Sequence, residues 1–175
     1  MVLPVIALIV IAVLVGLDQL IKIMVLNQLQ PVGTVELIPN VLDLTYVENY
    51  GAAFGILQNF GWLFIILTSI LSVAFILGLF LYKNHSAVSY IASILIVAGG
   101  IGNLIDRIFY GFVVDYIHFQ FSFFPFVFNL ADCCVTIGTV LILIHILFLS
   151  GKEQKYRGKK KNKKMGHSET ESLEG

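Results

Sequence analysis

Two acidic side chains, Asp115 and Asp132, are the residues of this chain best suited to do chemistry. Each lies within a turn or two of a long apolar segment, and the two flank a single connection. Two carboxyl groups that share a site separate their pKa values, so one can hold a proton while the other is ionised. The ionised group can take a proton from water, and the protonated group can support a substrate carbonyl and later a leaving amine. The pair therefore predicts acid–base chemistry at a membrane surface.

The other reactive residue types do not make a competing site. Only His118 is expected near the aspartates, because the other histidines are predicted at the opposite end of the helices or in the tail, so a metal site lacks ligands. Cys133 and Cys134 are adjacent, which prevents an unstrained disulfide between them, and we interpret them as small apolar residues inside a helix. We expect no metal ion and no other cofactor.

The elements that position these residues are predicted to be membrane helices. The chain is 58% apolar and 13% charged, and apolar runs at about 4–26, 60–82, 88–108 and 126–149 each approach the ~20 residues that cross a bilayer. The first run lacks a basic n-region and a convincing cleavage site, so it is predicted to be a helix. We predict an all-α integral membrane protein with one four-helix domain at 1–150 and a disordered basic tail at 151–175.

The basic residues predict the orientation of the helices. Eight of the eleven Lys and Arg residues lie in the tail, and Lys83 lies between helices two and three. The other connections, 27–59 and 109–125, contain no Lys or Arg. Since basic residues accumulate on the cytoplasmic side, both termini are predicted to be cytoplasmic and these two connections to be outside. We interpret the tail as a topology signal attracted to anionic lipid, and we expect no nucleic-acid partner.

The two outer connections are predicted to contain short strands. Apolar and polar residues alternate at 41–49 and again at 117–122, which is the pattern of a strand lying on a surface. Their aromatic residues suit the lipid interface. Pro125 suits the first turn of the fourth helix, where its missing N–H is not needed.

Polar residues gather in the outer half of three helices and share helix faces at i,i+3 or i,i+4 spacing. A charged residue near mid-bilayer costs roughly 2.5–3.5 kcal/mol, so such residues should face one another or a wet cavity. The cluster is made of Asp18, Gln19, Lys22, Asn103, Asp106, Arg107, Asn129 and Asp132.

Structural roles remain open for several members of this cluster. Asp18 and Lys22 could be a neutralised pair that locks the first helix, and Arg107 could extend to the outer headgroups. Asp106 is expected to be an interfacial partner and not a catalyst. Asn129 could be a hydrogen bonder between helices.

Five runs of residues resemble the lipoprotein signal peptidases, also called signal peptidase II. They are DQLIK (18–22), NYGAAFG (49–55), GNLIDR (102–107), VVDY (113–116) and FNLAD (128–132). The resemblance implies a membrane-embedded aspartic endopeptidase that removes the signal peptide from diacylglyceryl-modified prolipoproteins, cutting before the lipid-modified cysteine. It implies a multi-pass enzyme of the bacterial cell membrane, in contact with lipid, with its active site near the outer face; we expect a monomer.

The same resemblance assigns roles to residues. It implies that Asp115 and Asp132 are the catalytic pair and that Asp18 and Lys22 support the architecture. The positions that hold substrate backbone or shape the site are Asn49, Gly51, Asn103, Arg107 and Asn129. Separately from the resemblance, we hypothesise that the aromatic outer connections clamp the lipid-modified segment, and substitution of Phe54 would test this.

Two other classes of function remain as alternatives. A small transporter or proton-relay subunit would place polar residues along the whole membrane depth, but the inner halves of helices two to four contain no acid. A noncatalytic membrane scaffold would tolerate loss of either aspartate, or would misfold without it.

Overall fold

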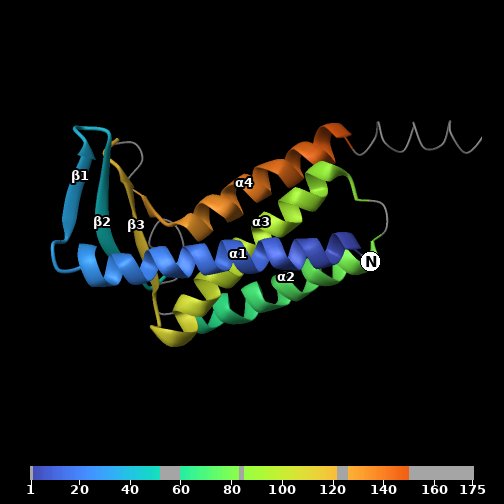
Figure 1. The fold of residues 1–175 in the computed structure, drawn as a ribbon, viewed down its shortest axis with the longest axis horizontal. Coiled ribbons are helices and arrows are strands. Elements are labelled where there is room, and N and C mark those ends of the chain that lie inside the picture. Colours follow the sequence, from blue (N-terminus) through green and yellow to red (C-terminus); the bar gives the residue numbers. More distant parts are fainter. Residues whose placement is uncertain (1, 52–59, 83–84, 122–125, 150–175) are drawn as a thin grey trace, which may run out of the picture.

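A computed structural model describes residues 2–51, 60–82, 85–121 and 126–149. In these ranges, four helical rods are long and apolar enough to cross a membrane (Figure 1). They are α1 (Val2–Met24, continued by the π-helical turn η1, Val25–Leu29), α2 (Gly61–Leu81), α3 (Ala87–Phe109) and α4 (Leu130–Ile144, continued by η3, His145–Leu149). The protein is therefore a mainly helical, multi-pass membrane protein, as the apolar runs predicted.

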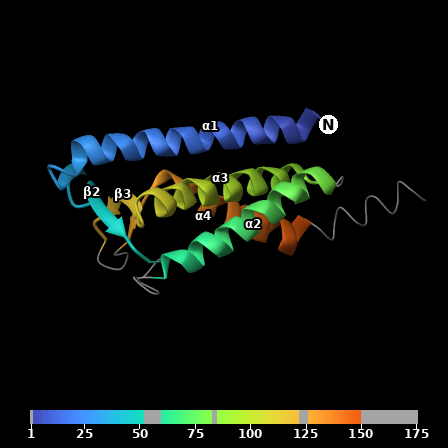
Figure 2. The same cartoon turned by 90° about the horizontal axis from the view of Figure 1, so that it is seen from below.

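Helix α3 is the centre of the bundle, since it packs against each of the other three helices (Figure 2). Glycines allow its close approach to α4. A Cβ atom on Gly99 would lie 2.2 Å from the Ala131 carbonyl oxygen, and one on Gly138 would lie 2.9 Å from that of Ala92. Small residues at such crossings let helix backbones meet, which favours packing inside a membrane. The crossing brings the start of α4 against the polar end of α3.

A small antiparallel sheet lies at one end of the bundle, far from the N-terminus (Figure 1). Among the described residues its order is β1 (Thr34–Ile38), β2 (Leu42–Asn49), β3 (Val113–Phe119) and β4 (Val127–Phe128). Val25 and Leu29 of η1 pack on Val114 and Tyr116 of β3, which joins the sheet to α1. This contact fixes the height of β3 above the helices.

The four-stranded sheet is larger than the short strands that the sequence predicted for the two outer connections of an otherwise all-α protein. Strand β2 matches the first alternating segment, whereas β3 shares only residues 117–119 with the second one, because it begins at Val113, contains Asp115 and ends at Phe119. Strands β1 and β4 were not predicted. All five residues of β1 are exposed, and β4 has only two residues, so neither carries a clear burial pattern.

The fourth helix begins at Leu130 and not near residue 126. Asn129 caps it, because its side-chain oxygen accepts the backbone N–H of Asp132 at 2.7 Å. The preceding residues are extended, and Phe128 pairs with Ile117 in the sheet. Because asparagine is a preferred N-cap residue, the helix begins after Asn129, and an apolar run that crosses this position predicts a helix that is too long.

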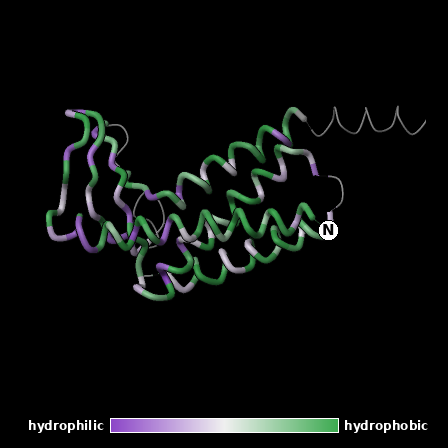
Figure 3. Tube along the Cα trace, in the orientation of Figure 1, coloured by the Kyte–Doolittle hydropathy of each residue, from purple (hydrophilic) through white to green (hydrophobic). Residues whose placement is uncertain are grey.

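Hydrophilic residues are concentrated in the sheet and where the sheet meets the helices (Figure 3). Pro125, Phe54 and the tail from residue 150 onward lie outside the described residues. The predictions made for them are therefore not addressed by the structure.

Candidate active site

Asp115 and Asp132 come from different elements that meet at the base of the sheet. Asp115 lies in β3, opposite Val47 of β2, and is 2% exposed. Asp132 lies in the first turn of α4. Strand β3 is held by its neighbours in the sheet and α4 by its crossing with α3, so two rigid elements position the two carboxyl groups.

Two asparagine side chains donate hydrogen bonds to Asp115. The Nδ2 of Asn49 donates to Oδ2 at 2.9 Å, and the Nδ2 of Asn129 donates to Oδ1 at 2.6 Å. Burial, followed by repulsion from the Asp132 carboxylate, raises the pKa of Asp115 to about 7, although the two asparagines and the Lys22 charge act in the opposite direction. Near neutral pH this carboxyl group therefore exists in both protonation states.

Asn103 and Asn129 link the two carboxyl groups. The Nδ2 of Asn103 donates to Asp132 Oδ1 at 2.6 Å. The Nδ2 of Asn129, which also binds Asp115, donates to the Oδ1 of Asn103 at 3.1 Å. The aspartates thus belong to one hydrogen-bonded network, and a change at either can be transmitted to the other.

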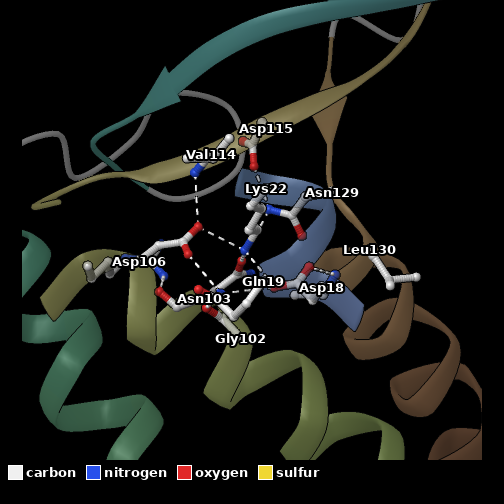
Figure 4. A network of polar contacts seen from close by, with 12 residues as sticks. Asp18, Gln19, Lys22, Gly102, Asn103, Asp106, Val114, Asp115, Asn129 and Leu130 are labelled. Carbon is white, nitrogen blue, oxygen red and sulfur yellow. Dashed lines mark hydrogen bonds and ion pairs between the residues drawn. The ribbon is translucent and has the colours of Figure 1, made fainter. Parts of the chain in front are cut away.

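A buried ionic cluster lies below this network (Figure 4). Lys22 is 1% exposed and forms ion pairs with Asp18 at 2.9 Å and with Asp106 at 2.8 Å. Gln19 donates to Asp106 Oδ1 at 3.0 Å. Because removing one partner of a buried ion pair leaves an uncompensated charge, each member should matter for folding.

The expectation that Asp106 is an interfacial residue was wrong. Its side chain is fully buried, and it accepts the backbone N–H of Val114 at 3.1 Å. Its i,i+3 spacing from Asn103 was the available signal, because that spacing puts both residues on one face of α3.

Arg107 lines a cavity of about 190 Å³ beside Asp132. Its Nη2 donates to the carbonyl oxygen of Gly51 at 3.1 Å, and its guanidinium carbon lies 5.0 Å from the centre of the Phe64 ring. Asn49 accepts the backbone N–H of Gly51 at 3.0 Å. The Arg107 side chain therefore belongs to this site and does not simply extend to the lipid headgroups. A planar guanidinium at this place can bind a peptide carbonyl oxygen.

All nine residues predicted for the site lie in one connected set of contacts. They are Asp18, Lys22, Asn49, Gly51, Asn103, Arg107, Asp115, Asn129 and Asp132. The histidine expected near the pair does not join them, because the Nδ1 of His118 contacts Asp43 at 2.9 Å. Within the described ranges, no group of three or more His, Cys, Asp or Glu side chains is arranged to hold a metal ion.

Comparison with known proteins assigns this arrangement to a family. The sequence profile described as "Signal peptidase (SPase) II" matches residues 10–148. A lipoprotein signal peptidase of Clostridioides difficile (strain 630) is 49% identical over 148 residues, which cover 83% of this chain and 97% of that one. One of Caldanaerobacter subterraneus subsp. tengcongensis is 39% identical over 145 residues, with 83% and 98% covered.

A solved structure of a bacterial membrane enzyme shares the fold. It is 34% identical to this chain with a TM-score of 0.73, and the match covers 81% of this chain and 87% of that one. The family match spans most of the chain and contains both aspartates and the residues around them. This chain belongs to the signal peptidase II family and is an aspartic endopeptidase.

Proposed function

We propose that this peptidase removes the signal peptide from diacylglyceryl-modified prolipoproteins, cutting before the lipid-modified cysteine, with Asp115 and Asp132 as its catalytic pair. The observation that carries the proposal is the linkage of the two carboxyl groups through Asn129 and Asn103 beside the cavity that Asp132 lines. The curated relatives are named lipoprotein signal peptidases, which supports this class of substrate.

The proposed reaction uses one ionised and one protonated aspartate. The ionised carboxylate takes a proton from water, whose oxygen attacks the scissile carbonyl. The protonated carboxyl group donates a hydrogen bond to the carbonyl oxygen as negative charge develops there. A proton is then passed to the amine nitrogen, the C–N bond breaks, and the pair again holds one proton. The pKa of about 7 at Asp115 supports such sharing at neutral pH.

Groups at the cavity are proposed to hold the substrate backbone. Arg107 and Asn49 hold the backbone on both sides of the Gly51 Cα atom, since Arg107 donates to the Gly51 carbonyl oxygen and Asn49 accepts the Gly51 N–H. A segment held in this way can present backbone groups to an extended substrate, and the guanidinium has further donors for a carbonyl.

The site is proposed to lie at the outer face of the membrane. The sheet, whose strand β3 contains Asp115, and the start of α4, which contains Asp132, occupy one end of the bundle, whereas the N-terminus lies at the other (Figure 1). Lys83 of the α2–α3 connection and the basic residues of the 151–175 tail belong to that second end in sequence, which supports a cytoplasmic location for it. A signal helix anchored by its lipid in the outer leaflet would then present its scissile bond at the level of the pair.

The test compares purified wild-type protein with Asp115→Asn and Asp132→Asn on a diacylglyceryl-modified prolipoprotein and on its unmodified precursor. We expect wild type to cut only the modified form and both folded variants to be inactive. Asp43→Asn is the matched control, because it removes another buried carboxyl group outside the site, and it should cleave like wild type. Near wild-type activity in either folded variant of the pair would refute the assignment. Equal cleavage of both precursors would refute the lipid requirement.

A further inference from the structure

We propose that Lys22 is a positioning residue for the catalytic pair, because its ammonium group decides which way the Asn103 carboxamide faces. The inference rests on the proposed roles of Asp115 and Asp132. It gives Lys22 a task in catalysis beyond its ion pairs, since it acts on the reacting carboxyl groups through Asn103.

All three protons of the Lys22 ammonium are used in contacts with neighbouring oxygens. Nζ lies 2.9 Å from Asp18 Oδ2, 2.8 Å from Asp106 Oδ2 and 3.0 Å from Asn103 Oδ1. An ammonium group has three donors and no acceptor, so these three contacts use all of them. The atom of Asn103 that faces Lys22 must therefore be its oxygen.

The Asn103 carboxamide has an oxygen at one end and an NH₂ group at the other, so the group that faces Lys22 decides which group faces Asp132. With Oδ1 facing Lys22, the Nδ2 of Asn103 faces Asp132 and donates at 2.6 Å. The reverse orientation would set NH₂ against two donors, Lys22 and the Nδ2 of Asn129, and would set oxygen against the Asp132 carboxylate. The Nδ2 of Asn129 also donates to Asp115 at 2.6 Å. The direction imposed by Lys22 thus decides how Asp132 is hydrogen-bonded, and it presents to Asn129 the oxygen that accepts from the same Nδ2 that binds Asp115.

The carboxylates of Asp18 and Asp106 hold the Lys22 ammonium in place, and each also binds backbone of another element. Asp18 Oδ1 accepts the backbone N–H of Ala131 at 2.9 Å, and Asp106 Oδ2 accepts that of Val114 at 3.1 Å. Ala131 and Val114 directly precede the two catalytic aspartates in the chain. The carboxylates that bind Lys22 therefore also fix the start of α4 and the start of β3 (Figure 4). One cluster sets both the backbone positions and the amide direction.

The experiment removes the ammonium without changing the net charge of the cluster. In wild type, two carboxylates and one ammonium give a net charge of −1. Asp18→Asn combined with Lys22→Met or with Lys22→Gln leaves only the Asp106 carboxylate, which is also −1. The methionine variant has no donor for Asn103, whereas the glutamine variant keeps an N–H donor. Asp18→Asn alone retains the ammonium and has a net cluster charge of 0, so it is the reference for loss of the Asp18 carboxylate, whereas the two double variants are matched in charge to each other and to wild type.

We expect the folded methionine double variant to lose about 100-fold in kcat relative to Asp18→Asn, with KM changed much less, since small misplacements of reacting groups cost rates of this order. The glutamine double variant should recover about 10-fold of this loss, the value of one hydrogen bond. A purely structural Lys22 would lower stability equally in both and leave kcat of the folded protein unchanged. Equal kcat in the two double variants, or values within about 3-fold of the reference, would overturn the proposal.

A measurement on the wild-type protein keeps the inference testable if the double variants do not fold. Magic-angle-spinning NMR of labelled protein in lipid should place the Nδ2 protons of Asn103 near the Asp132 carboxyl carbon. Proximity of those protons to Lys22 Nζ would overturn it. The outcomes are separable from the proposed function. Activity of Asp132→Asn would refute the catalytic pair itself, whereas full activity of the methionine double variant would refute only the role of Lys22.

Discussion

The substitution Asp115→Asn is expected to abolish cleavage and also to change how the stability of the folded protein depends on pH. Burial and the neighbouring Asp132 carboxylate raise the pKa of Asp115 from 3.8 to about 7. The folded protein therefore binds this proton more tightly than the unfolded protein does. Between these two pKa values, wild-type stability falls as pH rises, because the folded state resists ionisation. The asparagine variant cannot ionise at this position and lacks the fall.

The size of the effect follows from the two pKa values. At 1.36 kcal/mol per pKa unit, raising the pH from 5 to 8 lowers the wild-type free energy of unfolding by about 2–3 kcal/mol through this group. The variant gives up one acceptor, because the two oxygens of Asp115 bind Asn49 and Asn129 and an amide has only one oxygen. That loss of roughly 1–3 kcal/mol is largely independent of pH. The variant should therefore gain on wild type steadily as the pH rises.

The assay is thermal unfolding of both proteins in one detergent at several values between pH 5 and pH 8. The difference in melting temperature should move in favour of Asp115→Asn by about 5–10 °C across this range. Asp43→Asn is the control. Burial alone would raise the pKa of Asp43, but hydrogen bonds from Thr45, Gln120 and His118 outweigh burial and lower it, so this variant should keep a constant offset from wild type above pH 5. A constant offset for Asp115→Asn as well would refute the assigned pKa and its cause.

Three further outcomes are expected. Because its lowered pKa favours the charged form, Asp43 should stabilise the sheet above its unfolded pKa and lose this effect as the pH falls through its folded pKa. The protection of β2 and β3 amides against hydrogen exchange, corrected for the intrinsic rate, should then decrease more in wild type than in Asp43→Asn. Arg107→Lys keeps the charge but loses the planar donors that reach Gly51, so KM should rise roughly 10-fold, and an unchanged KM would show that this contact does not serve binding. Gly99→Ala should destabilise the protein by roughly 1–3 kcal/mol in a thermal melt, since the added Cβ atom would meet the backbone of α4. Gly16→Ala is its control, because a Cβ atom there meets nothing within 4 Å, and it should be neutral or stabilising by up to about 1 kcal/mol in the same melt.

Local features of the sequence were sufficient for the spans, for strand β2, for the end of β3 and for the polar faces. Helix-length apolar runs and period-two alternation depend on neighbouring residues only, and each reports which environment a segment must occupy. The i,i+4 spacing of Asp18 and Lys22 is also local, and the ion pair it predicted is present at 2.9 Å. The family resemblance added the roles proposed for the aspartates, which spacing alone could not assign.

The tertiary structure decided which of these faces meet. Burial of Asp106 against Lys22 depends on how α1 crosses α3, and the bond from Ala131 to Asp18 joins residues 113 positions apart. The predicted start of α4 was too early, because hydropathy does not distinguish an apolar strand from an apolar helix. Pairing of Phe128 in the sheet and the cap at Asn129 are the features that end the strand and begin the helix. The sequence determined which side chains had to be shielded from lipid, because the free-energy cost of placing a polar side chain in hydrocarbon is a property of each residue. Only the packed helices and sheet determined their partners, because hydrogen-bond geometry depends on positions that distant segments share.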